Sequence, residues 1–258
     1  MKTFIITSIG AIALLTLLTG CNDTSNQQIV ESQAVTTLTS IPTTTPTPSL
    51  APVPALTPTP SHTPASKEES MQALIPAGWH ILEPFQGGRA IAEGDLNKDG
   101  IADVAAVIEK NTGKDEASPR SLLIAFGGNN NTYTLSIIAD HVILQADEGG
   151  VWGDPFENII IDRGAVLVSD YGGSNWRWYN KYRFRYQDQD WYLIGSTSGT
   201  YFTGAVTMEQ ADEDDINYLT GQFIKRKTDE QGQTTTTKGN QGKKKLIKLK
   251  EFNSEDVQ

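Results

Sequence analysis

The sequence predicts an all-β domain, mainly antiparallel, built as a sandwich or a propeller-like stack of sheets with at most one short helix. Runs of alternating or β-branched residues recur between positions 104 and 194. Clusters of Gly, Asn and Asp separate these runs, as turns do. All five tryptophans and all eight tyrosines lie beyond position 73, which supplies the bulk for a core.

The alternation is strictest at 181–187, where aromatic and basic residues face opposite sides of one strand. The expected strands are Val104–Ile108, Ser121–Phe126, Tyr133–Ile138, Asn158–Ile161, Val166–Ser169, Tyr182–Tyr186 and Trp191–Ile194. Only Thr207–Leu219 reads as helical, because Thr207 and Gln210 fit a capping box and Gly221 fits a helix end. After it, Gln222–Lys227, Thr234–Thr237 and Lys245–Lys250 predict one or two hairpins.

The first residues predict an export signal. One charge, Lys2, precedes an uncharged apolar run that ends at Leu18-Thr19-Gly20-Cys21. These four residues resemble the bacterial lipobox, in which the cysteine is acylated and becomes the mature N-terminus. Cys21 is the only cysteine of the sequence, so it has no partner within the chain for the disulfide that an exported protein would otherwise form. The resemblance implies a protein anchored by lipid on the extracytoplasmic face of a cell membrane.

The expected organisation is a signal peptide at 1–20, a lipidated N-terminus with linker at 21–73, a β domain at 74–252 and a flexible tail at 253–258. Eight of the residues 36–66 are proline and ten are threonine, which predicts a disordered, extended spacer. Residues 74–224 hold 22 acidic and 10 basic residues, whereas residues 225–250 hold nine basic and two acidic ones. The acidic body argues against nucleic acid as a partner. We expect the basic end to form a hairpin that faces this body, with an anionic surface as the alternative.

One loop carries the chemistry of a calcium site. Oxygen-bearing side chains occupy positions 1, 3, 5 and 9 of a tight turn, and glycine occupies position 6. The expected ligands are the side chains of Asp95, Asn97, Asp99 and Asp103 and the carbonyl of Ile101. Because an EF-hand needs a glutamate at position 12, where this chain has Ala106, the loop is a different kind of calcium turn.

From Ala92 to Tyr133 the chain resembles the FG-GAP (integrin-α-like) and VCBS repeats. The resemblance rests on Gly94–Val104 and on the strand and glycine-asparagine turn of Leu122–Asn129. It implies a strand–loop–strand unit whose structural calcium keeps the loop rigid. This chain departs from the family by carrying one such loop.

Aromatic residues with nearby carboxylates predict a surface for sugars, because the apolar faces of sugars pack on aromatic rings. The candidates are Trp152, Asp154, Tyr171, Trp176 and Trp178. The alternative is that Trp176 and Trp178 share a strand face and belong to the core.

The sequence assigns no catalytic residue. The β domain holds two histidines and no cysteine, and Ser174 lacks the glycine that a nucleophile elbow needs two positions further on. We therefore expect a calcium-stabilised binding module for a cell-wall glycan or an envelope protein. The alternative is a carbohydrate hydrolase that uses carboxylates within Glu148–Glu157.

Overall fold

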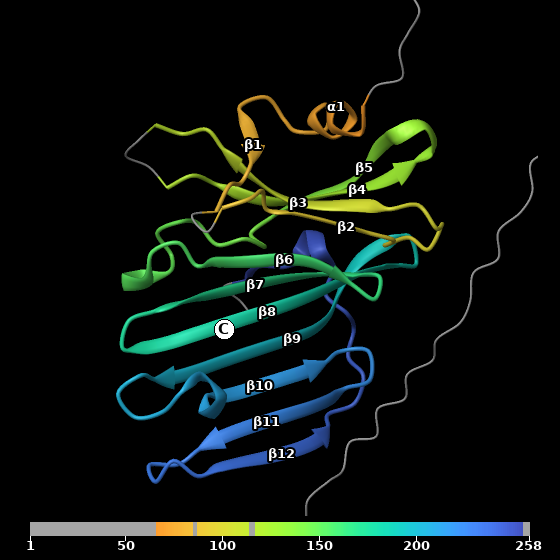
Figure 1. Ribbon diagram of the computed structural model, residues 1–258. Coiled ribbons are helices and arrows are strands. Elements are labelled where there is room, and N and C mark those ends of the chain that lie inside the picture. The colour runs from red at the N-terminus through yellow and green to blue at the C-terminus, as the bar shows by residue number, and fades with distance from the viewer. Residues whose placement is uncertain (1–65, 85–86, 114–116, 255–258) are drawn as a thin grey trace, which may run out of the picture. The chain divides into compact units, whose positions relative to one another are not determined.

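The computed structural model describes residues 66–84, 87–113 and 117–254. They form one short helix, four 3-10 turns and two antiparallel sheets in a sandwich-like arrangement (Figure 1). The predicted mainly antiparallel β fold is confirmed. Cys21 and the threonine–proline linker lie outside the described residues, so the lipid anchor stays a prediction.

The smaller sheet has five strands in the order β1-β3-β4-β5, with β2 also paired to β3. β1 pairs with residues 108–110 of β3 and β2 pairs with residues 103–106, so the two short strands share one edge of β3. The loop with the expected calcium ligands connects β2 to β3. The strands are β1 (Trp79–Ile81), β2 (Ile91–Gly94), β3 (Asp103–Lys110), β4 (Arg120–Gly128) and β5 (Thr132–Asp140).

The larger sheet has seven strands in the order β12-β11-β10-β9-β8-β7-β6, so each strand pairs with its neighbour in sequence. Such a meander needs only short turns, in agreement with the Gly, Asn and Asp clusters. The strands are β6 (Phe156–Asp162), β7 (Ala165–Gly173), β8 (Trp176–Gln187), β9 (Asp190–Phe202), β10 (Asp212–Asn217), β11 (Gln222–Thr228) and β12 (Thr234–Asn240).

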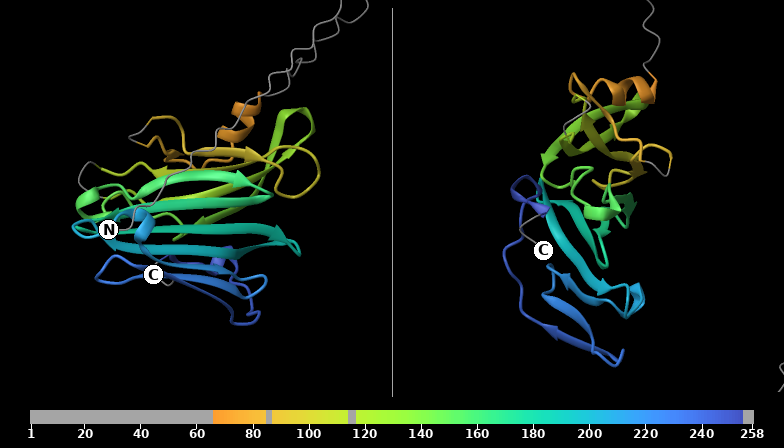
Figure 2. Two further views of the ribbon diagram at one scale, coloured as in Figure 1. Left: turned by 60° about the horizontal axis from the view of Figure 1, so that its bottom comes forward. Right: turned by 90° about the vertical axis from the view of Figure 1, so that its left-hand side faces the viewer.

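The main core lies between the two sheets. Alternate residues of β4, such as Leu122 and Ile124, pack there with Val168, Tyr182 and Phe184 of the larger sheet. The intervening residues of the smaller sheet form a second core under α1 (Lys67–Gln72), which covers the opposite face (Figure 2). β3 is therefore buried on both faces, which explains its continuous apolar run.

The C-terminal segment returns from β12 to the main core (Figure 1). Phe252 packs edge-on against Tyr182 and Phe184, with ring centroids 4.9 and 5.1 Å apart. Lys248 forms an isolated bridge with Tyr192, and a 3-10 turn follows at Leu249–Glu251. The strand predicted at 245–250 is therefore wrong, because this stretch forms only an isolated bridge with the larger sheet before it turns.

The helix predicted at Thr207–Leu219 is also wrong. Gln210 Oε1 does accept from the Thr207 N–H at 3.4 Å, but only a 3-10 turn, Met208–Gln210, forms before β10 begins. The acidic residues of β10 pair across the sheet with the basic residues of β11. The pairs are Asp212–Lys227, Glu213–Arg226 and Asp214–Lys225, at 3.1, 3.2 and 3.1 Å. Contacts with β11 therefore override the local helical signal, and this part of the basic segment faces acidic residues as expected.

Packed residues extend past both expected domain boundaries. Ser66 and Glu69 form a capping box at the start of α1, and Met71 is buried in the second core. At the other end, Ser254 is buried and its N–H donates to the carbonyl of His141 at 2.9 Å. The boundaries at 74 and 252 are therefore too narrow, and only residues 255–258 of the expected tail lie outside the described part.

Candidate functional site

The β2–β3 loop has the turn geometry that its sequence predicts. The Asp95 carboxylate accepts the N–H groups of Lys98 and Gly100, at 2.6 and 3.2 Å. Asn97 Oδ1 accepts the Asp99 N–H at 2.9 Å, and Asp99 Oδ1 accepts the Ile101 N–H at 2.7 Å. Gly100 has a φ of +82°, in the left-handed region that favours glycine. The three side chains therefore turn inward over their own backbone.

Asp103 fastens this loop to the smaller sheet. Its side chain is fully buried, and Oδ2 accepts the N–H groups of Leu96 and Asn97 at 2.7 and 3.2 Å. Oδ1 accepts the Gly127 N–H at 2.8 Å. Burial raises the pKa of Asp103, while these three N–H groups act in the opposite direction. Asp103 thus already has a structural function in the loop.

The donor set suits calcium, because Asp95, Asn97 and Asp99 place hard oxygens within one turn. Asn97 Nδ2 donates to Asp99 Oδ2 at 2.9 Å, so these two ligand candidates already lie side by side. Among the described residues, however, no group of three or more His, Cys, Asp or Glu side chains is arranged to hold a metal. Calcium therefore stays a prediction that rests on ligand type and turn geometry.

None of the three candidate tryptophans is buried. Trp152 is 53% exposed, Trp176 is 64% exposed and Trp178 is half-buried. They do not form one surface, because strand alternation places Trp176 and Trp178 on the face of β8 opposite to Arg177. Tyr171 pairs with Tyr179 and therefore shares the Arg177 face. The predicted aromatic surface thus divides between the two faces of the larger sheet.

Trp178 lines a pocket of about 300 Å³ on the face of the larger sheet that also carries the core residue Tyr182. Its register partners there are Gly172 of β7 and Thr200 of β9. A Cβ atom on Gly172 would lie 2.4 Å from Cζ2 of Trp178, so only glycine lets the ring lie across β7 at this point. The pocket is also lined by Asn180, Ser198, Gly199, Asp212, Glu213, Asp214 and Lys227.

The polar groups of this pocket differ in how fully they are paired. Asp212 accepts the Thr228 N–H at 2.9 Å and Lys227 Nζ at 3.1 Å. Burial favours a higher pKa for Asp212, but these partners outweigh it and the pKa is lowered. Asp214 Oδ2 accepts Lys225 Nζ at 3.1 Å, whereas Oδ1 is buried without a hydrogen-bond partner among the described residues.

Asp154 is exposed, but its carboxylate is already paired. Its two carboxylate oxygens accept hydrogen bonds from the two terminal nitrogens of Arg120, each at 2.7 Å. The Arg120 side chain is 2% exposed and also binds Glu109 at 2.8 Å. Burial tends to raise the pKa of Asp154, but the hydrogen bonds from Arg120 outweigh it and hold the pKa below its usual value. The ion pair with Arg120 therefore fixes the position of the Asp154 carboxylate, and a ligand-binding function for Asp154 stays a prediction.

A second carboxyl, that of Asp170, lies nearby and has no hydrogen-bond partner in the described part of the chain. Asp170 is fully buried, and neither of its oxygens has a hydrogen bond among the described residues. Burial raises the pKa of Asp170 to about 8, although the charge of Arg120 opposes the shift. Asp170 pairs in register with Asn180 of the Trp178 pocket. The alternation of β7 places Asp170 inward, but no sequence pattern indicates which charges surround it.

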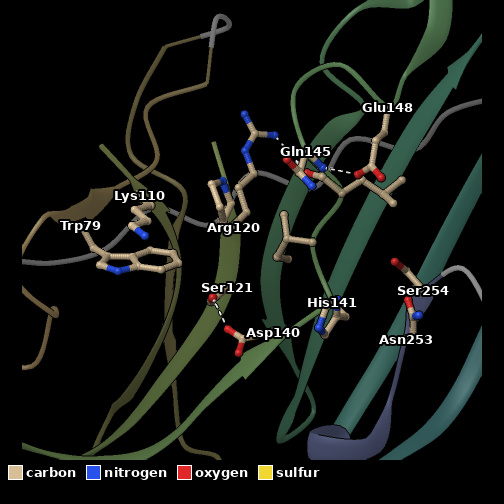
Figure 3. A pocket seen from close by; sticks show the side chains of 13 residues that line it. Trp79, Lys110, Arg120, Ser121, Asp140, His141, Gln145, Glu148, Asn253 and Ser254 are labelled. Carbon is tan, nitrogen blue, oxygen red and sulfur yellow. Dashed lines mark hydrogen bonds between the residues drawn. The ribbon is translucent and has the colours of Figure 1, made fainter. Parts of the chain in front are cut away.

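Another pocket, of about 320 Å³, lies where the ends of β1, β3 and β4 meet the C-terminal segment (Figure 3). Figure 3 shows Ser121 and Asp140 paired on one wall and His141 on another. Ser121 Oγ donates to Asp140 Oδ1 at 2.6 Å, so its proton is directed to a carboxylate and not to the histidine. This arrangement does not activate Ser121 as a nucleophile.

No protein-family model, curated protein or solved structure matches this chain. Within the described part of the chain, every helix is too short or too polar to cross a membrane. Sequence reasoning found Trp178 but missed Asn180, Ser198 and Thr200. Their contribution depends on the register of β8 and β9, which no single segment encodes.

Proposed function

We propose that this protein is a lipid-anchored, extracytoplasmic binding module for a neutral cell-wall glycan. Acylated Cys21 attaches the chain to the outer face of the membrane, and the threonine–proline linker gives the β domain its reach. Calcium in the Asp95–Asp103 loop stabilises the fold. The glycan binds in the pocket that Trp178 lines.

The observation that carries this proposal is the composition of the Trp178 pocket. One wall is an indole ring, and the others present an amide, two hydroxyls, carboxylates and the ammonium of Lys227. A pyranose ring combines apolar C–H faces with equatorial hydroxyls, so it needs a flat apolar surface beside hydrogen-bonding groups. The Ser198 and Thr200 hydroxyls, which line the pocket, supply hydrogen-bonding groups for such hydroxyls.

The alternative, a glycoside hydrolase within Glu148–Glu157, receives less support. Such enzymes need one carboxyl that is protonated at the working pH and a second that is ionised. Arg120 keeps Asp154 ionised, and Asp170, whose raised pKa suits an acid, is fully buried. An enzyme of this kind would lose turnover when the exposed Glu157 is replaced in Glu157→Ala, a variant that leaves the ion pair between Arg120 and Asp154 intact.

The test is calorimetric titration of the full chain with tetra-N-acetylchitotetraose, a neutral analogue of the wall glycan. Trp178→Ala is compared with Trp176→Ala, a matched control that removes a more exposed indole two positions away on the same strand face. We expect Trp178→Ala to weaken binding about tenfold, which corresponds to about 1.4 kcal/mol, and the control to change it less than about twofold. Equal effects of the two variants, or no binding by the unmodified chain, would refute the assignment.

A further inference from the structure

The opposite face of the larger sheet carries a cation that no described acidic residue neutralises directly. Arg177 lies on β8, and among residues 66–84, 87–113 and 117–254 no carboxylate forms an ion pair with it. Its Nη1 donates to the Gly173 carbonyl at 3.0 Å. The remaining N–H groups of the guanidinium are available to an anion.

Two aromatic rings hold this guanidinium in place. Its central carbon lies 4.5 Å from the ring centroid of Trp152 and 5.9 Å from that of Tyr171. Trp152 and Tyr171 meet edge-to-face, with centroids 4.9 Å apart and an interplanar angle of 80°. The Tyr171 hydroxyl shares a hydrogen bond of 2.7 Å with that of Tyr201. The cation is thus oriented by stacking, which leaves its charge unpaired.

The chain around Trp152 is fixed before any ligand arrives. The Gly173 N–H donates to the Gly149 carbonyl at 2.9 Å, and the Tyr171 N–H donates to the Pro155 carbonyl at 2.8 Å. Asp154, two residues after Trp152, is held by the bidentate pair with Arg120. A rigid surface loses little conformational entropy on binding, so a small contact area can give measurable affinity.

We infer that the surface formed by Trp152, Tyr171 and Arg177 binds an acidic sugar, specifically a hexuronate residue of a polysaccharide. The exposed half of Trp152 suits the apolar face of a pyranose ring. In a hexuronate the carboxylate is attached directly to that ring, so a sugar packed on the free face of Trp152 extends its charge past the edge of the indole toward Arg177. Arginine recognises carboxylates through paired N–H donors.

This site is separate from the Trp178 pocket, because the two lie on opposite faces of the larger sheet. It also requires a different ligand, since the carboxylates of the Trp178 pocket are paired with basic side chains whereas this surface offers an arginine that forms no ion pair among the described residues. The hexuronate site therefore does not depend on the proposed function. Trp178→Ala is expected to leave hexuronate binding unchanged.

The test is titration of the full chain with trigalacturonate and with its methyl ester, which keeps the rings and removes the charge. We expect the free acid to bind and the ester to bind at least about tenfold more weakly. Arg177→Gln and Arg177→Lys are each expected to weaken binding about tenfold, because lysine keeps the charge but not the stacked, planar donors. Arg163→Gln, which removes an exposed arginine in the turn between β6 and β7, is the control and is expected to change binding less than about twofold.

Three results would overturn the inference. Equal binding of acid and ester would show that the carboxylate is not recognised. Equal losses in Arg163→Gln and Arg177→Gln would show general charge attraction. Tighter Arg177-dependent binding of oligomeric glycerol phosphate than of trigalacturonate would assign the surface to phosphate. Melting temperatures of all variants, measured in parallel, separate loss of binding from loss of fold.

Discussion

Replacing Asp170 by asparagine tests the electrostatics of the larger sheet. The unfolded chain ionises this carboxyl near its ordinary pKa of 3.8, whereas burial in the folded chain raises the pKa to about 8. Between these two values the folded state binds the extra proton, so ionisation favours unfolding as the pH rises. The contribution of Asp170 to stability therefore falls from about pH 4 to about pH 8 and is constant above that.

Each pKa unit corresponds to about 1.4 kcal/mol, so at pH 7 the buried carboxyl costs at most about 4 kcal/mol. Asparagine has nearly the same shape and does not ionise, so Asp170→Asn removes this cost. The assay is guanidinium unfolding of both proteins at about pH 5, 7 and 8.5. We expect the variant's advantage in unfolding free energy to grow by about 3 kcal/mol between pH 5 and pH 7. An advantage that stays the same across this range would refute the assignment of a protonated, buried Asp170.

Three further predictions address the loop, the pocket and the C-terminal segment. Excess EGTA should lower the melting temperature by several degrees relative to a calcium buffer, and Asp99→Ala should remove the difference; identical melting curves with and without EGTA would contradict a calcium site. Gly172→Val should displace the Trp178 ring, because a Cβ at position 172 would lie 2.4 Å from Cζ2 of Trp178. Glycan binding should weaken about tenfold while the fold is retained; unchanged affinity would contradict the assignment of the glycan to this pocket. Phe252→Ala should cost about 3–5 kcal/mol in urea unfolding, because the ring packs between the sheets, and a cost below about 1 kcal/mol would disprove that packing.

Local patterns predicted the strands of this protein well. The alternation at 181–187 placed Tyr182 and Phe184 inward and Lys181 and Arg183 on the opposite face, and the burial pattern confirms it. Alternation also predicted that Trp176 and Trp178 share one strand face. It did not show that this part of the strand lies outside the main core, because the extent of the core depends on where the smaller sheet ends.

Two of the errors have a common physical origin, which is interaction between distant segments. The local sequence around the acidic residues of β10 predicts a helix, but pairing with the basic residues of β11 makes this segment a strand. Asp154 reads as a free carboxylate because Arg120, its partner, is 34 residues away. The short helix α1 was missed, although Ser66 and Glu69 fit a capping box, because its six residues follow a long proline-rich segment.

The central claim is that the Trp178 pocket is the glycan site, and the indole N–H resonances of the five tryptophans test it most directly. A titration with tetra-N-acetylchitotetraose is followed by nitrogen–proton correlation spectra, with each resonance assigned by substitution. The account predicts a saturable shift of the Trp178 resonance, while the resonances of the buried Trp191 and the distant Trp79 stay in place. A Trp178 resonance that does not move while the sugar binds elsewhere, or a spectrum that does not change at all, would contradict it.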